Sequence, residues 1–350
     1  MFGFNNPIVQ QDLKDMARLG LQWNEFQNRT ILITGANSML GTYMAYLFLF
    51  LNLSKKLNTK VVVLTRSLDK TKELYQEFLS DSNFFIINQD IIYPIHYIGR
   101  IDFIFHFAGN ASPKFIKSDP VGILQSNLLG TFNIMELARD KEPQRIIFAS
   151  TREVYGAVKA DSIIEDLFGS LNPMENRSCY PESKRAAESI IRSYYLQYKI
   201  NSISVRIAHC YGPGMKIDND GRVMADFISD AVYKRDIVLN SSGDAIRSFC
   251  YITDAIIGLI QVCLYGKIGE AYNLANEKEP ITVRNLAYLV SNIMSNQNKI
   301  VFSNNQSQEG YCSFKRVPLN TKKIENLGFI PQVSLTDGIF KTIRSFTLDS

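Results

Sequence analysis

The sequence predicts an α/β protein: a doubly wound parallel sheet of the Rossmann type with a smaller C-terminal substrate lobe. Short apolar runs alternate with helical stretches through the first 208 residues. Nearly continuous hydrophobicity in such runs is typical of parallel strands that are covered by helices on both faces. A glycine-containing turn follows the first run directly, at residues 34–41. The chain is 350 residues long, so a lobe added to one large core is expected.

The predicted elements follow in chain order. Residues 1–28 precede any strand signal and predict a helical extension, with an amphipathic helix over 8–19 that Trp23 and Phe26 anchor. Residues 29–208 form the predicted Rossmann domain, with strands over 30–34, 61–65, 84–87, 101–107, 145–149 and 202–207. Residues 43–51 are apolar throughout and predict a buried helix, because a membrane span needs about 20 apolar residues.

Beyond residue 208 the alternation breaks up, and residues 209–350 are predicted to form most of the substrate lobe. Helices are expected near 222–233, 253–264, 282–294 and 335–344, and the helix over 253–264 is expected to pack back on the sheet. A net charge of +4 with scattered basic residues argues against nucleic acid as a partner, and no membrane partner is expected. The five cysteines show no C-x-x-C spacing, which predicts a reducing, cytoplasmic location and no metal site.

The turn after the first predicted strand reads TGANSMLG and leads into a helix. Glycines in a strand–turn–helix unit let the backbone approach a pyrophosphate, which then lies on the helix N-terminus. Ser38 occupies the middle position, so the glycine pattern is incomplete. The residues expected to hold a dinucleotide here are Gly35, Asn37, Ser38, Met39, Leu40 and Gly41.

The ends of the next strands refine the cofactor prediction. Arg66 stands where an acidic residue usually binds the ribose hydroxyl, so NADP is favoured over NAD; the alternative is an exposed arginine at a strand end. Asp90 is expected to receive the adenine amino group. His106 is either near the cofactor or a core histidine with one hydrogen bond. The further cofactor-binding residues predicted at these strand ends are Ile91, Phe107, Ala108 and Gly109.

A tyrosine followed four residues later by lysine is the predicted redox centre. Three such pairs occur: Tyr155/Lys159, Tyr180/Lys184 and Tyr195/Lys199. Tyr180 begins a helix with Pro181 in its first turn, whereas Tyr195 lies about 22 Å further along that helix. Tyr155 is expected to form a wall of the pocket. A nearby lysine, the helix N-terminus and an oxidised nicotinamide ring favour the phenolate of Tyr180, and Thr151 would hydrogen-bond the same sugar oxygen.

Together these motifs resemble the extended short-chain dehydrogenase/reductases, the NAD-dependent epimerase/dehydratase family of nucleotide sugars, and most closely its UDP-glucuronate decarboxylase branch. The segments that carry the resemblance are residues 34–41, 150–156, 172–184, 206–213, 220–223 and 247–254. It implies an enzyme with Thr151, Tyr180 and Lys184 as catalytic residues and with a nucleotide-diphosphate sugar as substrate. It also implies a homodimer through helices near 118–139 and 179–199. The remaining residues predicted to bind cofactor or substrate are Asn127, Ser112, His209, Arg222, Val223, Arg247 and Arg316.

The reaction depends on two residues beside Thr151. Arg152 stands where related decarboxylases carry serine and dehydratases aspartate, and an arginine does not relay protons. Glu153 keeps a carboxylate that is either a base or a structural hydrogen-bonding group. Hydride transfer at the sugar C4 is therefore expected, with a 4-keto-sugar reductase or C4 epimerase favoured. The alternatives are a UDP-glucuronate decarboxylase or 4,6-dehydratase and, more remotely, a non-catalytic NAD(P)-sensing module.

Overall fold

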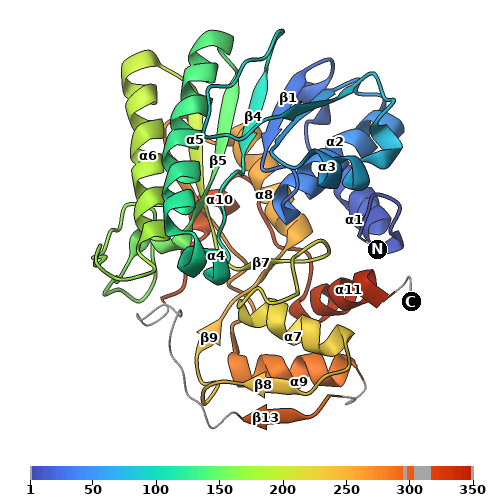
Figure 1. Ribbon diagram of the computed structural model, residues 1–350, viewed down its shortest axis with the longest axis vertical. Helices are drawn as coiled ribbons and strands as arrows, with labels where there is room; N and C mark the ends of the chain where they lie inside the picture. Colours follow the sequence, from blue (N-terminus) through green and yellow to red (C-terminus); the bar gives the residue numbers. More distant parts are fainter. Residues whose placement is uncertain (1, 295–297, 303–316, 348–350) are drawn as a thin grey trace.

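A seven-stranded, fully parallel sheet forms the upper part of the molecule in the computed structural model, which describes residues 2–294, 298–302 and 317–347 (Figure 1). Its spatial order is β3-β2-β1-β4-β5-β6-β11. The six predicted strands are confirmed, and the seventh, β11, was not predicted. The bounds are β1 Thr30–Thr34, β2 Lys60–Thr65, β3 Phe84–Asn88, β4 Phe103–His106, β5 Arg145–Thr151, β6 Ser202–Ile207 and β11 Ala271–Leu274.

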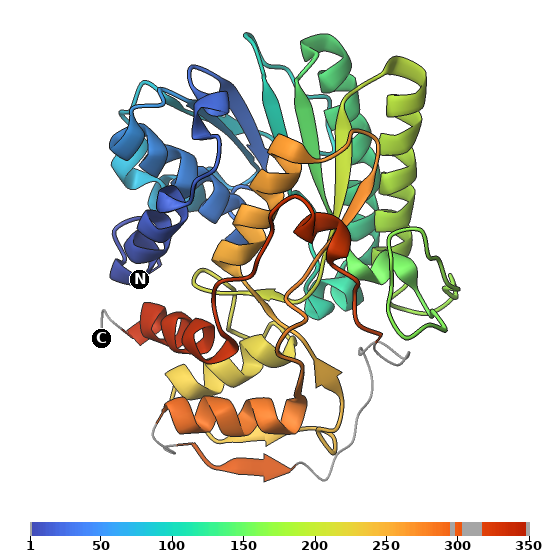
Figure 2. The same cartoon turned by 180° about the vertical axis from the view of Figure 1, so that it is seen from behind.

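Helices cover both faces of the sheet, and alternate strand residues enter two separate cores. Ile31 and Ile33 of β1 pack on the side of α2 and α8, whereas Leu32 packs on the side of α5 and α6. Figures 1 and 2 show these two layers from opposite sides, with α8 lying against the sheet in Figure 2. The helices of this part are α2 Met39–Lys55, α3 Leu68–Leu74, α4 Pro113–Ser118, α5 Pro120–Lys141, α6 Cys179–Tyr198 and α8 Ile252–Tyr265, with short 3-10 turns at Gln76–Phe78 and Arg152–Tyr155.

The N-terminal extension forms helix α1 (Pro7–Arg18) and a 3-10 turn, η1 (Trp23–Phe26), and packs against α2, α8 and α11. Asp12 of α1 is fully buried. Its carboxylate accepts hydrogen bonds from the hydroxyls of Tyr43 (3.1 Å) and Tyr251 (2.7 Å). It also forms an ion pair with Lys341 (2.8 Å). The extension therefore joins the helix behind the glycine turn to the last helix of the chain.

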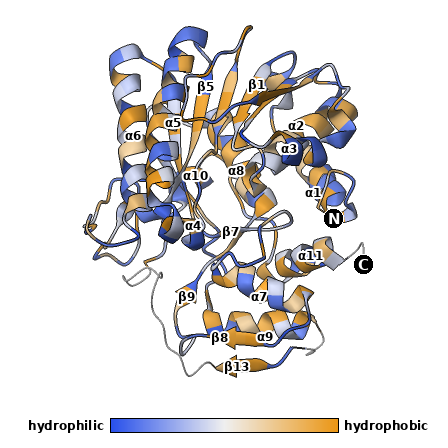
Figure 3. Cartoon of the chain, in the orientation of Figure 1, coloured by the Kyte–Doolittle hydropathy of each residue, from blue (hydrophilic) through white to orange (hydrophobic). Residues whose placement is uncertain are grey.

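The smaller lobe lies below the sheet and is built mainly from residues beyond 208 (Figure 1). Its helices α7, α9 and α11 pack on one another, and β8 pairs with β13. Figure 3 shows apolar residues concentrated in the strands and on the packed faces of the helices. The bounds are β7 Cys210–Tyr211, α7 Val223–Val232, β8 Ile237–Leu239, β9 Ile246–Arg247, β10 Cys250–Tyr251, β12 Ile281–Thr282, α9 Val283–Ile293, β13 Ile300–Phe302 and α11 Leu335–Thr347. The short helix α10 (Lys322–Glu325) packs instead on β11 of the sheet.

The apolar helix predicted over residues 43–51 is the central part of α2, and most of it is fully buried between the sheet and α1. In the described residues, none of the helices combines the length and apolar character that crossing a bilayer requires. The four described cysteines, Cys179, Cys210, Cys250 and Cys263, are free thiols. The fifth, Cys312, lies outside the described residues.

Candidate functional site

The predicted site residues come together at the carboxyl edge of the sheet. β1 and β4 are neighbours there, and their last residues, Thr34 and His106, are paired in register. The chain leaves β1 toward α2 and β2, but leaves β4 toward β5 on the other side. This reversal of strand order opens a crevice at the strand ends, which is where α/β sheets bind their ligands.

The glycine turn after β1 packs closely against the backbone at the end of β4. Gly35 has φ 65°, and a Cβ atom built on it would lie 2.8 Å from the backbone nitrogen of Ala108. Ser38, which breaks the glycine pattern, is the N-cap of α2 and accepts a hydrogen bond from the Gly41 amide (3.2 Å). The serine thus satisfies a helix donor, and Met39 and Leu40 form the first turn of α2.

Asn37 fixes this turn to the end of β2. Its amide group donates to the Thr65 hydroxyl (2.9 Å) and the Ser67 carbonyl (3.2 Å), and its oxygen accepts from Thr71 (3.0 Å). The loop that carries Arg66 is therefore held rigidly beside the glycine turn. Because both loops are fixed by hydrogen bonds within the chain, this part of the site is formed before any ligand binds.

The deeper part of the crevice holds one buried polar atom without a partner, the Oδ1 of Asn127 on α5. The amide nitrogen of the same side chain donates to Ser183 (2.9 Å). Gly109 faces it: a Cβ atom there would lie 2.5 Å from Asn127 Oδ1 and 3.3 Å from Lys184 Nζ. A buried hydrogen-bond acceptor without a partner, next to a glycine that leaves space, fits a bound dinucleotide. The dinucleotide would donate a hydrogen bond to Asn127 and fill the space beside Gly109.

At the rim, Arg66 and Asp90 form an ion pair of 3.7 Å. Arg66 is 74% exposed, so this pair is screened by solvent and adds little to stability. The guanidinium is thus available at the end of β2, where the sequence prediction required it. Ile91, next to Asp90, is buried against Gly130 of α5.

His106 is a core histidine, with two hydrogen bonds rather than one. Its Nδ1 lies 2.8 Å from the Thr34 hydroxyl and its Nε2 lies 3.3 Å from the Thr131 hydroxyl. Thr34 Oγ1 already accepts from the amides of Phe107 (3.1 Å) and Ala108 (3.0 Å), so its proton points at Nδ1. Burial lowers the pKa of His106 to about 3, and the ring is neutral.

The predicted redox residues lie together where β5 meets α6. Thr151 is the last residue of β5, and its hydroxyl lies close to that of Tyr180 in the first turn of α6. Burial raises the pKa of Tyr180 above its usual range, the Glu153 charge raises it further, and the nearby Thr151 hydroxyl opposes both. Without a cofactor the phenol form of Tyr180 is therefore favoured, whereas the predicted phenolate also depends on an oxidised nicotinamide beside it.

Lys184 lies one helical turn beyond Tyr180 and is 5% exposed. Its ammonium donates to the carbonyl of Ala149 (2.8 Å) and lies 4.6 Å from the centre of the Phe148 ring. Burial lowers its pKa to about 8. The residue thus joins β5 to α6 and faces the Asn127 side of the crevice.

The residues beside Thr151 have partners of their own. Glu153 makes a two-contact ion pair with Arg177, at 2.9 and 3.2 Å. Arg152 donates to the carbonyl of Val317 (3.0 Å). Sequence reasoning missed Arg177, which lies only three residues before Tyr180 but 24 residues from its partner. A basic residue just before that helix was the one available signal.

The predicted sugar-side residues lie on loops between the sheet and the lobe. The Ser112 hydroxyl donates to the Asp220 carbonyl (3.1 Å), and the Asp220 carboxylate is paired with Arg222 just before α7. Val223 begins α7. His209 is exposed, and its ring lies 5.9 Å from that of Phe249.

The two arginines predicted to bind phosphate are the remaining sugar-side residues. Arg247 is on β9, and its guanidinium donates to the Ile246 carbonyl (2.8 Å). Arg316 lies outside the described residues. No group of three or more histidine, cysteine or acidic residues suited to a metal ion occurs in the described part of the chain.

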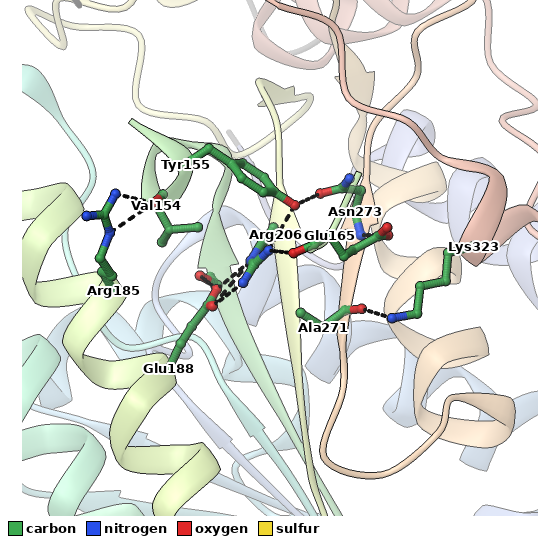
Figure 4. A network of polar contacts seen from close by, with 10 residues as sticks. Val154, Tyr155, Glu165, Arg185, Glu188, Arg206, Ala271, Asn273 and Lys323 are labelled. Carbon is green, nitrogen blue, oxygen red and sulfur yellow. Dashed lines mark hydrogen bonds and ion pairs between the residues drawn. The ribbon is translucent and has the colours of Figure 1, made fainter. Parts of the chain in front are cut away.

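Tyr155 differs from its prediction as a wall of the pocket. Its ring is 1% exposed, and its hydroxyl donates to Asn273 (2.6 Å) and accepts from Arg206 (3.0 Å). The residue follows Thr151 by four positions within a 3-10 turn, which directs it into the interior beside β6 and β11 (Figure 4). It is therefore a core residue.

Comparison with known proteins agrees with this geometry. The profile of the NAD dependent epimerase/dehydratase family matches residues 31–275. UDP-glucuronic acid decarboxylase 3 of Arabidopsis thaliana is 33% identical over 312 residues, which cover 89% of this chain and 87% of the relative. UDP-glucuronic acid decarboxylase 1 of Xenopus tropicalis is 30% identical over 92% of this chain and 73% of its own length.

Solved structures share the fold at lower identity. UDP-glucose 4-epimerase from Thermotoga maritima superposes with a TM-score of 0.77 at 20% identity, covering 91% of this chain and 99% of that one. dTDP-glucose 4,6-dehydratase from Streptomyces venezuelae, solved with NAD, gives 0.76 at 22% identity, with 91% and 97% covered. With the ordered motifs, the parallel sheet and the family profile in agreement, this chain belongs to the NAD dependent epimerase/dehydratase family of enzymes.

Proposed function

We propose that this enzyme transfers a hydride at C4 of a nucleotide-linked sugar without a second elimination step, as a 4-keto-sugar reductase or a C4 epimerase. The arrangement beside Thr151 carries the proposal. Arg152 stands where related enzymes carry a side chain that can relay a proton. Its guanidinium donates a hydrogen bond to the Val317 carbonyl. Both carboxylate oxygens of Glu153 accept hydrogen bonds from the two terminal nitrogens of Arg177, so the carboxylate is already engaged within the chain.

The remaining residues are sufficient for this chemistry. A bound nicotinamide supplies or accepts the hydride. Tyr180 donates a proton to the sugar oxygen or removes one, and Thr151 holds the same oxygen through its hydroxyl. Lys184 binds the ribose and, as an ammonium one turn from Tyr180, stabilises the phenolate when it forms. The proposed crevice lining is Gly35, Asn37, Ser38, Met39, Leu40, Gly41, Asp90, Ile91, Phe107, Ala108, Gly109 and Asn127.

On the sugar side, we place the nucleotide diphosphate between the loop of Ser112 and the start of α7. Arg222 there is 40% exposed and close to the crevice edge, and guanidinium groups bind phosphate through paired contacts. Val223, His209 and Arg247 are proposed to complete the contacts, together with Arg316 from outside the described residues. A pre-existing partner, Asp220, orients Arg222 before the substrate arrives.

For the cofactor, we propose NADP(H) in preference to NAD(H). The family is NAD-dependent, but β2 ends in Arg66 rather than an acidic residue, which suits a 2′-phosphate. We also propose a homodimer through α5 and α6. These helices pack together and expose Val121, Leu129, Phe132, Leu196 and Tyr198 on their outer faces, and clustered apolar exposure of this kind is typical of an interface.

A decarboxylase is the second candidate, because the relatives at 30–33% identity bear that name. The 4-keto acid formed by C4 oxidation loses carbon dioxide without a dedicated base, and an arginine such as Arg152 could neutralise the substrate carboxylate. A 4,6-dehydratase is less well supported, because it requires the proton donor that Arg152 replaces.

The test is incubation with a panel of UDP-, dTDP-, GDP- and CDP-sugars, including 4-keto-6-deoxy forms and UDP-glucuronate, with either reduced or oxidised cofactor. Loss of reduced cofactor in equal amount to product supports the reductase, and inversion at C4 without net cofactor change supports the epimerase. Carbon dioxide release from UDP-glucuronate would contradict both. Arg152→Ser is the matched variant: decarboxylase or dehydratase activity gained only on this change would strengthen the assignment.

A further inference from the structure

A half-buried ion pair lies beside the redox residues and takes no part in the proposed chemistry. Arg206 of β6 contacts the carboxylate of Glu188 on α6 at 2.7, 3.0 and 3.2 Å, and both side chains are 14% exposed (Figure 4). The same guanidinium donates to the Tyr155 hydroxyl (3.0 Å) and to the Glu165 carbonyl (2.7 Å). Such a pair costs desolvation free energy, so its presence calls for a specific role.

The pair contacts both elements that carry the catalytic residues, strand β5 and helix α6. Ser150, the residue before Thr151, donates its hydroxyl proton to Glu188 (2.5 Å). Glu188 is also one helical turn beyond Lys184 and two turns beyond Tyr180 on α6, so the three side chains share one face of the helix. One carboxylate thus reaches the strand end that carries Thr151 and the helix face that carries the other two residues.

The network continues away from the site. The Tyr155 hydroxyl donates to Asn273 of β11 (2.6 Å), whose amide nitrogen donates to the carbonyls of Ile163 (2.9 Å) and Asn320 (3.0 Å). Four elements of the sheet domain and the segment after residue 316 therefore meet at Arg206 and Tyr155. This arrangement holds Glu188 in one position.

The surroundings of Lys184 include few other charges. On α6, Tyr180 is a neutral phenol and Glu188 is the acidic neighbour. From β4, His106 faces Lys184 as a neutral ring, and from α5, Asn127 contributes an uncharged amide. β5 contributes the Ala149 carbonyl and the Phe148 ring. Among these described neighbours, Glu188 is the anion, and Arg206 is its counter-charge.

We propose that Glu188 and Arg206 are positioning residues of the redox centre: Glu188 fixes the end of β5 through Ser150, and the balance of charge within the pair sets the protonation of Lys184. The inference rests on the proposed function, because it assigns a role to residues that support Tyr180, Thr151 and Lys184. Substituting Glu188 or Arg206 should therefore change the pH range in which the enzyme is active, and not only the stability of the protein.

The direction of each effect follows from electrostatics. Burial lowers the pKa of Lys184 to about 8, and the negative charge of Glu188 opposes that change. Glu188→Gln removes the anion and leaves Arg206, so the pKa of Lys184 falls further and the ammonium is lost at lower pH. Arg206→Met leaves the anion without its counter-charge, so the pKa of Lys184 rises. A purely structural role predicts no such opposite shifts.

The experiment is a pH titration of the Lys184 side chain by NMR in protein carrying ¹³C-labelled lysine, with the signal assigned by comparison with Lys184→Met. No substrate is needed, so the result is independent of whether the proposed function is correct. We expect the titration midpoint to move down in Glu188→Gln and up in Arg206→Met. Equal midpoints in both variants and in the unchanged enzyme would overturn the proposal.

Two further variants guard against loss of folding. Glu188→Asp keeps the charge and should return the midpoint toward that of the unchanged enzyme; a midpoint equal to that of Glu188→Gln would contradict the proposal.

Ser150→Ala removes only the hydrogen bond and should lower kcat about tenfold with little change in KM; unchanged kcat on an accepted substrate would remove the positioning role. Asp102→Asn is the control, because it breaks a buried ion pair at the opposite edge of the sheet, and it should leave the Lys184 midpoint unchanged.

Discussion

The two halves of the candidate site are built by opposite means. In the cofactor half, the turns at the strand ends are fixed by hydrogen bonds within the chain, as at Asn37 and Ser38. The sugar half consists of partly exposed charged side chains on loops, such as Arg222, which is paired with Asp220. The cofactor half is therefore rigid before a ligand binds. In the sugar half, charged side chains are expected to exchange a protein partner for the ligand.

The difference indicates which half determines which property. A rigid site loses little conformational entropy when a ligand binds. The cofactor half should therefore fix the geometry of hydride transfer in the same way for every substrate. Exposed guanidinium groups are adaptable, so the sugar half determines which nucleotide sugar is accepted. Substitutions in the two halves should therefore separate in their effects on turnover, cofactor affinity and substrate affinity.

The largest effect is expected at the junction of the halves. Tyr180→Phe removes the proposed proton donor and should lower kcat about 10³-fold on any accepted substrate. Tyr195→Phe is the matched control, because it alters the same tyrosine–lysine spacing 15 residues along the same helix and should leave kcat unchanged. Steady-state kinetics of both variants checks this, and comparable activity of Tyr180→Phe would remove that residue from the mechanism.

A large and selective effect is expected in the cofactor half. Gly35→Ala places a Cβ atom 2.8 Å from backbone atoms at φ 65°, where L residues are strained by about 1–2 kcal/mol. Cofactor affinity should fall about tenfold or more, measured by fluorescence titration. Gly243→Ala is the control: it has φ 75° and crowds Arg284 in the smaller lobe, and cofactor affinity should be unchanged. Equal losses in both variants would mean that the effect is general instability.

A smaller effect of the other kind is expected in the sugar half. Arg222→Gln should raise KM for the sugar nucleotide about tenfold, because one charge-assisted phosphate contact is lost, while cofactor affinity stays constant. Arg235→Gln, which removes another partly exposed arginine paired with an aspartate in the same lobe, should leave KM unchanged. A parallel loss of cofactor affinity in Arg222→Gln would break the separation between the halves.

The smallest effect is expected at the exposed rim. Arg66→Ser should lower the preference for NADPH over NADH by only a few fold, because a guanidinium that is 74% exposed acts through screened charge. Kinetics with both cofactors at low and high salt would measure it, and the preference of the unchanged enzyme should weaken as salt rises. Arg100→Ser, at the opposite edge of the sheet, is the control. An unchanged preference in Arg66→Ser would remove that residue from cofactor selection.

Much of the fold was predictable because the strands of a covered parallel sheet are apolar along their whole length. β11 was missed because the segment Ala271–Leu274 is short, contains Asn273 and follows the region where the alternation had broken up. Asn273 belongs there because its side chain bonds to Tyr155 and to two carbonyls, none of which is near it in sequence. Local pattern cannot show a polar strand residue that is satisfied by distant partners.

The candidate site was predictable where position along the chain determines position in space. Thr151, Tyr180 and Lys184 follow strand and helix ends, and the structure brings them together. Tyr155 was predicted wrongly, because the 3-10 turn after β5 rotates its ring into the core. The ion pairs of Glu153 with Arg177 and of Glu188 with Arg206 were not predictable, since tertiary packing selects one partner among many possible ones.

The buried carboxylate of the N-terminal helix has a consequence for how the molecule is made. Asp12 takes its ion-pair partner from Lys341, 329 positions later in the chain. During synthesis the first helix emerges while that partner does not yet exist, and its charge must stay in water until the last helix has left the ribosome. Helix α1 can therefore be fixed in place only when α11 packs against it, although the two helices lie far apart in the sequence.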